Sequence, residues 1–206
     1  MKIKTYQVRE KTLFIVIARY NLASKELKKL NAREVTLAEN AYARILLGEN
    51  SGLSRSGNWV REDVLCIPQK GVFLTKTPAT SESPEEATQA HRHLREFYLT
   101  KEQAEKALEN AIQLPYDITA IPTNRFEDDE RIRWMFEDFA RKYGEALRGE
   151  GIEEMPIWLP DEGYVNEQSK PFARKLWFFD LGCRSGLCGD YTSLRSNHGR
   201  LFGIRE

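Results

Sequence analysis

The sequence predicts an α+β protein built as one domain. Patterns of two main helices stand among several short strand patterns, and a long stretch without helical or strand periodicity precedes the final strand. The chain of 206 residues is long enough for one domain with a sizeable core, and nothing in it separates two halves. We therefore expect residues 1–206 to form a single domain.

The strand predictions rest on short runs of β-branched and aromatic residues. Residues 3–8 and 13–17 open the chain in this way, and similar runs occur around Trp59, at 64–67 and at 72–75. Residues 155–159 form another run between prolines, and the apolar run 172–181 leads into the C-terminal stretch. Residues 77–84, TPATSESP, read as a loop.

The helix predictions rest on caps and apolar spacing. Thr36 with Glu39 and Thr100 with Gln103 have the spacing of a capping box. They predict a helix that ends near Gly48 and a shorter one that runs through Ala111 and stops before a proline. The longest predicted helix covers 127–147, with a broad apolar and aromatic stripe that we assign to the core.

Composition excludes several classes of protein. Lys+Arg and Asp+Glu each number 31, so no long-range field favours nucleic acid or an anionic membrane. No apolar run approaches the roughly 18 residues that span a bilayer. The N-terminal apolar patch lacks a cleavage pattern and reads as a strand, so we expect cytoplasmic synthesis and no membrane span. Association with a virion or a cell surface would then depend on another component.

The C-terminal region, residues 178–205, has an unusual composition. It contains no Lys, Glu, Gln, Met or Trp, although these types make up roughly a quarter of the preceding sequence. None of these types has a codon that ends in a pyrimidine, whereas every residue present in the region has one. A disordered tail would avoid the aromatic residues and cysteines found here. The pattern therefore favours codons sampled from a restricted set, with an ordinary structured loop as the alternative.

This region resembles the variable proteins of diversity-generating retroelements. The resemblance covers about the last 30 residues and rests on the codon set, the aromatic run at 176–178 and the closing residues 203–205. In that family a reverse transcriptase miscopies template adenines, so that selected C-terminal codons vary while others stay fixed. The run 183–185 and the closing Gly-apolar-Arg are also similar to the formylglycine-generating-enzyme branch of the C-type lectin fold. Both relatives imply a C-type lectin-like fold with a small antiparallel sheet, in which residues 3–8 pair with residues 201–205.

The resemblance implies a binding protein for an unknown macromolecular ligand, a protein or a cell-surface target. We expect no enzyme activity and no cofactor, because the sequence has no phosphate-binding glycine loop, serine nucleophile elbow, zinc-protease helix or paired-carboxylate motif. Apolar anchors at Trp177, Leu181, Leu187, Leu194 and Ile204 should face inward, because random substitution in a core is costly. Phe202 would add apolar contact area. The expected ligand-binding residues are Phe179, Asp180, Gly182, Cys183, Gly186, Cys188, Asp190, Tyr191, Ser193, Arg195, Ser196, Asn197, His198 and Arg200.

Two other functions stay open. A cysteine oxidase of the formylglycine-generating type would act through Cys183 and Cys188, although only Arg184 is at hand to lower a thiol pKa. A zinc-stabilised structural protein is the second alternative, although the cysteine spacing is wide for a zinc knuckle. Its ligands would be Cys183, Cys188 and His198, completed by Cys66 or by His91 and His93.

Overall fold

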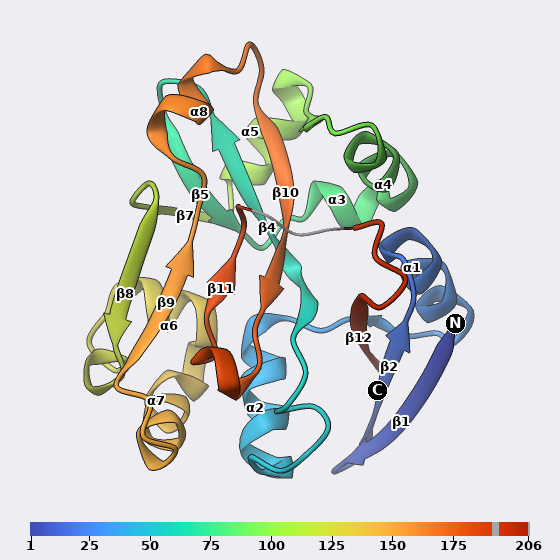
Figure 1. Cartoon of the computed structure of the whole chain (residues 1–206), viewed down its shortest axis with the longest axis vertical. Helices are drawn as coiled ribbons and strands as arrows, with labels where there is room; N and C mark the ends of the chain where they lie inside the picture. The colour runs from blue at the N-terminus through green and yellow to red at the C-terminus, as the bar shows by residue number, and fades with distance from the viewer. Residues whose placement is uncertain (191–193, 206) are drawn as a thin grey trace.

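A computed structural model describes residues 1–190 and 194–205. Its strands form one 12-stranded sheet with helices packed around it (Figure 1). The main path of the sheet follows the order β1-β2-β12-β4-β10-β11-β9-β8. The prediction of a small antiparallel sheet is wrong, because the sheet is large and two of its pairs, β12 with β4 and β11 with β9, are parallel. Several added strands have only two residues, too few to leave a periodic pattern in the sequence.

The strands have the following bounds. Those on the main path are β1 (Lys2–Val8), β2 (Lys11–Ile17), β4 (Asn58–Ile67), β8 (Ile118–Pro122), β9 (Glu154–Trp158), β10 (Phe172–Phe178), β11 (Leu187–Cys188) and β12 (Arg200–Arg205). Those off the path are β3 (Arg33–Glu34), which pairs with β12, β5 (Gly71–Thr75), which pairs with β4 and β7 (Ala111–Leu114), and β6 (Phe97–Tyr98), which pairs with β10.

The two ends of the chain meet in one part of the sheet, but not through the predicted pair of strands (Figure 1). β12 pairs antiparallel with β2, with Leu201 opposite Val16 and Gly203 opposite Phe14. β1 forms a hairpin with β2 and lies at the end of the strand order. Burial explains the difference, because four consecutive residues of β2 are buried whereas β1 is largely exposed.

Two predicted helices are present with their caps. α2 (Leu37–Leu47) begins at the Thr36 capping box and α5 (Lys101–Leu108) at the Thr100 capping box. α5 ends before the predicted stop, because Ala111 begins β7. The predicted helix 127–147 is wrong as one element, since Glu137 takes a left-handed φ of 52°. The segment divides into α6 (Glu130–Phe136), the 3₁₀ turn η2 (Glu137–Phe139) and α7 (Ala140–Gly149).

The remaining helical elements were not predicted. Two of them, α3 and the start of α4, fall on the segment 77–84 that was expected to be a loop. They are α1 (Tyr20–Lys29), α3 (Ala79–Glu82), α4 (Pro84–Arg92), α8 (Glu162–Glu167) and the 3₁₀ turns η1 (Thr123–Arg125) and η3 (Leu181–Cys183). No helix among the described residues is long and apolar enough to cross a membrane.

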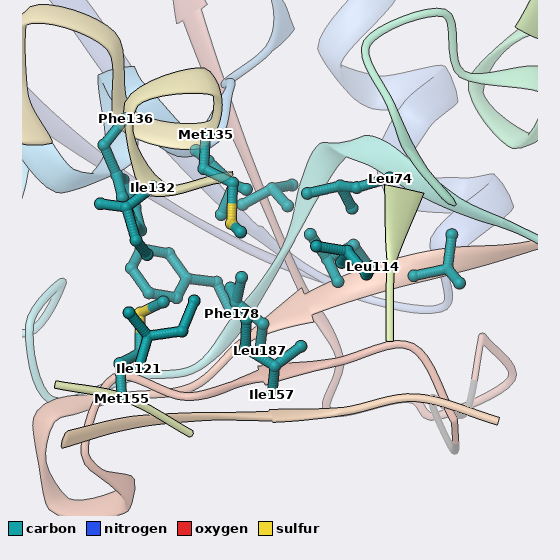
Figure 2. Packing of buried hydrophobic residues seen from close by; sticks show 14 of the residues in the cluster. Leu74, Leu114, Ile121, Ile132, Met135, Phe136, Met155, Ile157, Phe178 and Leu187 are labelled. Atoms are coloured by element: carbon teal, nitrogen blue, oxygen red, sulfur yellow. The ribbon is translucent and has the colours of Figure 1, made fainter. Parts of the chain in front are cut away.

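The main core joins the C-terminal region to the rest of the fold. Phe178 and Leu187, both fully buried, lie against the stripe that α6 contributes, as Figure 2 shows. A second core contains Trp59 of β4, Leu194, Leu201 and residues of β2 and α1. The C-terminal region therefore contributes side chains to both cores and does not lie loosely on the surface.

Candidate binding surface

A row of large side chains crosses four strands on one face of the sheet. Cys188 of β11 lies opposite Trp158 of β9 on one side and opposite Trp177 of β10 on the other. Trp177 also lies opposite Trp59 of β4. Residues directly opposite one another project to the same face. The neighbouring row, Ile157, Leu187 and Phe178, is buried in the main core. The tryptophan row therefore occupies the other face.

Aromatic side chains on this face contact one another edge to face. Trp59 is buried and its ring lies 5.5 Å from that of Trp177. Phe179, the first residue after β10, lies 6.4 Å from Trp177 and 5.4 Å from Trp158. We call Trp158, Trp177 and Phe179, which are all half-buried, the aromatic platform. Rings of this kind offer large contact area with little loss of conformational entropy on binding.

Glycines in the C-terminal region make room for the indole rings. A Cβ on Gly199 would lie 1.9 Å from the Trp59 ring, and one on Gly186 would lie 2.4 Å from the Trp158 ring. Both distances are too short for a side chain to be accommodated without movement of a ring. The prediction that position 186 faces a ligand is therefore wrong, because Gly186 is buried beneath Trp158.

The C-terminal region is held largely through its main chain. Such contacts do not depend on the side chains of the region, so they tolerate substitution. The main-chain N–H groups of Ala18, Tyr20, Leu181 and Gly189 donate to the carbonyl groups of Gly199, Leu194, Ser54 and Trp158, respectively, over 2.9 to 3.1 Å.

A buried arginine supports the turn that follows β10. Arg44 of α2 is 3% exposed, and its Nη1 donates to the carbonyl oxygen of Phe179 at 2.6 Å and to Ser185 Oγ at 3.3 Å. Its guanidinium lies 3.9 Å from the centre of the Phe178 ring. The Tyr143 hydroxyl also bonds to Ser185 Oγ, at 2.8 Å. The turn η3 is thus fixed from inside the protein while its outer side chains remain exposed.

The predicted ligand-binding residues divide by exposure. Tyr191 and Ser193 lie outside the described residues. Cys188 is 8% exposed because β11 lies between β9 and β10, so the prediction that it faces outward is wrong. The exposed residues are Gly182, Cys183, Asp190, Arg195, Asn197 and His198, and the half-buried ones are Phe179, Asp180, Ser196 and Arg200.

The predicted apolar anchors are mostly correct. Leu187, Leu194 and Ile204 are buried, whereas Trp177 and Leu181 are only half-buried. Phe202 is fully buried in a third cluster with β2 residues, so it offers no contact area to a ligand.

The surroundings of Cys183 and Cys66 do not activate either thiol. Partial burial and then the nearby Asp180 carboxylate raise the pKa of exposed Cys183, and burial raises the pKa of Cys66. A raised thiol pKa reduces the thiolate that would react or bind metal at neutral pH. Within residues 1–190 and 194–205, no group of three or more His, Cys, Asp or Glu side chains could hold a metal ion.

Two features of this surface were missed in the sequence. Alternation along residues 155–159 could have identified Trp158, because Met155, Ile157 and Leu159 are buried and Trp158 points the other way. Arg44 carried no such signal, because its target is a main-chain carbonyl 135 residues away.

No known protein family and no curated protein matches the sequence. Among solved structures, the chain is similar to one described as showing the accommodation of massive sequence variation in Nanoarchaeota by the C-type lectin fold. The two align over 99% of each chain with a TM-score of 0.67 and 17% sequence identity. At that identity the likeness carries information about the fold alone. The chain described here has the C-type lectin fold.

Proposed function

We propose that this chain is a ligand-binding protein, without enzyme activity, whose C-terminal region displays a surface diversified by retroelement mutagenesis. Its ligand is a macromolecule, either a protein or another cell-surface target. The ligand contacts the exposed side chains of the region together with the aromatic platform. Gly186 and Cys188, which are buried, take no direct part.

One observation carries the proposal: the region is anchored from within while many of its side chains point outward. Main-chain hydrogen bonds, the Arg44 contact with Phe179 and buried leucines hold its path. Exposed positions such as Cys183 and Arg195 contribute little to that anchoring, whereas the exposed Asn197 adds one bond, because its Oδ1 accepts from Arg19 Nε at 2.9 Å. A surface of this kind accepts substitution at low cost in stability, which a diversified site requires.

Two further observations support the proposal. The composition of residues 178–205 matches a set of codons that end in a pyrimidine, as sampled codons would. The likeness to a C-type lectin fold associated with massive sequence variation is consistent with a fold that accommodates diversity.

The test is deep sequencing of the 3′ end of the gene, with a search of the flanking DNA for a near-copy that carries adenine at the varied bases. We expect substitutions at exposed positions such as Arg195 and Asn197, with Leu187 and Leu194 unchanged as internal controls. An invariant C-terminal region with no template copy would overturn the proposal.

A protein-level test separates a display surface from a structural loop. Arg195→Ala should leave the melting temperature nearly unchanged, and Asn197→Ala should cost at most about 1 kcal/mol through loss of its exposed bond to Arg19. Leu187→Ala should lower the stability by about 2–5 kcal/mol because Leu187 is fully buried. Unfolding of the Arg195 variant would contradict the proposal.

A further inference from the structure

A cavity of about 390 Å³ lies beside the C-terminal region, lined by residues of α4, α8 and β10 and by the segment after α4. Asp190 and Leu194 of the C-terminal region form part of its wall, and His91, Arg95 and Tyr164 form other parts. Residues inside and outside the diversified region therefore border one space.

The carboxylates of the cavity already have partners. Glu96 accepts hydrogen bonds from Arg174 Nε at 3.1 Å and Arg174 Nη2 at 2.6 Å, and also from the Tyr164 hydroxyl. Asp190 Oδ1 accepts from Arg174 Nη1 at 2.9 Å, and Asp161 Oδ1 accepts from the Tyr164 N–H at 2.8 Å. These groups and Arg174 hold one another in place.

Two other cationic side chains have no such partners: Arg95, which lines the cavity, and Arg195, which follows the lining residue Leu194 but does not itself line the cavity. The exposed side chains of Arg95 and Arg195 make no hydrogen bond or ion pair with any residue that the structure describes. His91 Nδ1 is buried and has no partner there either. Burial lowers the pKa of His91, and the charges of Arg195 and then Arg174 lower it further, against an opposing effect of Glu96. Of the two arginine charges that act on His91, that of Arg174 is paired with Glu96 and Asp190, whereas that of Arg195 has no partner among the described residues.

We propose that a side-chain carboxylate of a protein ligand binds beside His91, with Arg95 and Arg195 as donors. The proposal rests on the proposed function, because it names the chemistry that the binding surface recognises. A carboxylate is favoured over the phosphates of nucleic acid, because the chain has no net charge to attract a polyanion. Arg95 lies outside residues 178–205 and Arg195 lies inside, so a fixed arginine provides the preference for a carboxylate and position 195 adjusts it.

The test uses NMR titration of the imidazoles, of which the chain has three. His93→Gln and His198→Gln each remove one signal and so assign His91. Nα-acetylglutamic acid α-amide, which carries only the side-chain carboxylate, is the probe, and Nα-acetylglutamine amide is its uncharged control. We expect the acid to shift the His91 signal saturably and to raise the His91 pKa, because a nearby carboxylate stabilises the imidazolium. The amide should do neither.

Variants locate the site. Arg95→Gln and Arg195→Gln should each weaken binding of the acid at least about fivefold. Arg92→Gln is the matched control, because Arg92 is exposed on α4 but neither lines the cavity nor is among the charges that shift the pKa of His91.

Three results would overturn the inference. They are no His91 response at about 50 mM probe, an equal response to the uncharged amide, and a stronger response to inorganic phosphate, which would assign the site to a phosphate-bearing ligand instead. An invariant C-terminal region in the sequencing experiment would overturn the proposal of a diversified surface but would leave a measured carboxylate site in place. A varied C-terminal region together with no response of His91 to the acid would overturn only the carboxylate site.

Discussion

Replacing Lys175 with methionine should destabilise the protein severely. The Lys175 ammonium is fully buried and lies 3.0 Å from Glu34 Oε2 and 3.3 Å from Asp63 Oδ1, while it donates to Ser81 Oγ at 2.7 Å. Glu34 is 8% exposed and Asp63 is fully buried. Methionine fills much of the same volume but removes the cation that neutralises these two carboxylates.

The expected loss is about 3–5 kcal/mol, as found when one partner of a buried ion pair is removed. Guanidinium unfolding followed by tryptophan fluorescence would measure it. The control is Lys106→Met. Lys106 Nζ lies 2.9 Å from Glu82 Oε1, and both side chains are more than half exposed. That control should change the stability by at most about 1 kcal/mol.

The pH dependence provides the second half of this prediction. Burial raises the pKa of Asp63, and the charge of Lys175 opposes that rise. Without Lys175 the pKa of Asp63 rises further, so the folded variant is most stable when the carboxyl is protonated and loses stability as the pH rises. The deficit relative to the parent should therefore shrink between about pH 7.5 and about pH 4.5. A deficit below about 1 kcal/mol at neutral pH, or one that does not change with pH, would refute the reasoning.

Three more predictions address the supports of the binding surface. Arg44→Met should lower the stability by about 1.5–3 kcal/mol in denaturant unfolding, through lost bonds to the turn after β10; an unchanged unfolding midpoint would contradict this. Glu62 supports the start of α2, where its two carboxylate oxygens accept from the Leu37 N–H at 3.1 and 3.0 Å. Burial raises the pKa of Glu62 to about 7, so its contribution to stability is lost as the pH rises from about 4.5 through 7. Glu62→Gln should therefore remove up to about 3 kcal/mol of the fall in the free energy of unfolding across this pH range. Denaturant unfolding at several pH values would measure it, and the same dependence on pH in variant and parent would contradict the reasoning. Gly199→Ala should destabilise by about 1–3 kcal/mol, because its Cβ would meet the Trp59 ring, whereas Gly149→Ala has open space around it and should not. Equal melting temperatures for the two glycine variants would rule out this account.

The sequence predicted elements whose signals are local. The capping boxes at Thr36 and Thr100 placed two helix starts correctly, because both partners of a box lie within one turn. The break at Glu137 was not predicted, since neither glycine nor proline marks it and an ordinary residue takes a left-handed φ.

The site was predicted in part for the same reason. The burial of Leu187 and Leu194 followed from their apolar side chains, a property that needs no knowledge of distant contacts. The burial of Gly186 and Cys188 follows from strands distant in sequence, because β11 pairs with β9 and Gly186 lies beneath Trp158. Composition alone gives no access to such contacts.

The central position of β12 has a consequence for synthesis of the protein. β12 lies between β2 and β4, so the sheet cannot close until the codons for residues 200–205 have been translated. A product that terminates within residues 178–199 would lack β12 and leave two apolar strands with open edges, which favours aggregation or degradation. No stop codon ends in a pyrimidine, so a gene restricted to pyrimidine-ended codons at its varied positions would change this surface freely without ever truncating the strand that completes the fold.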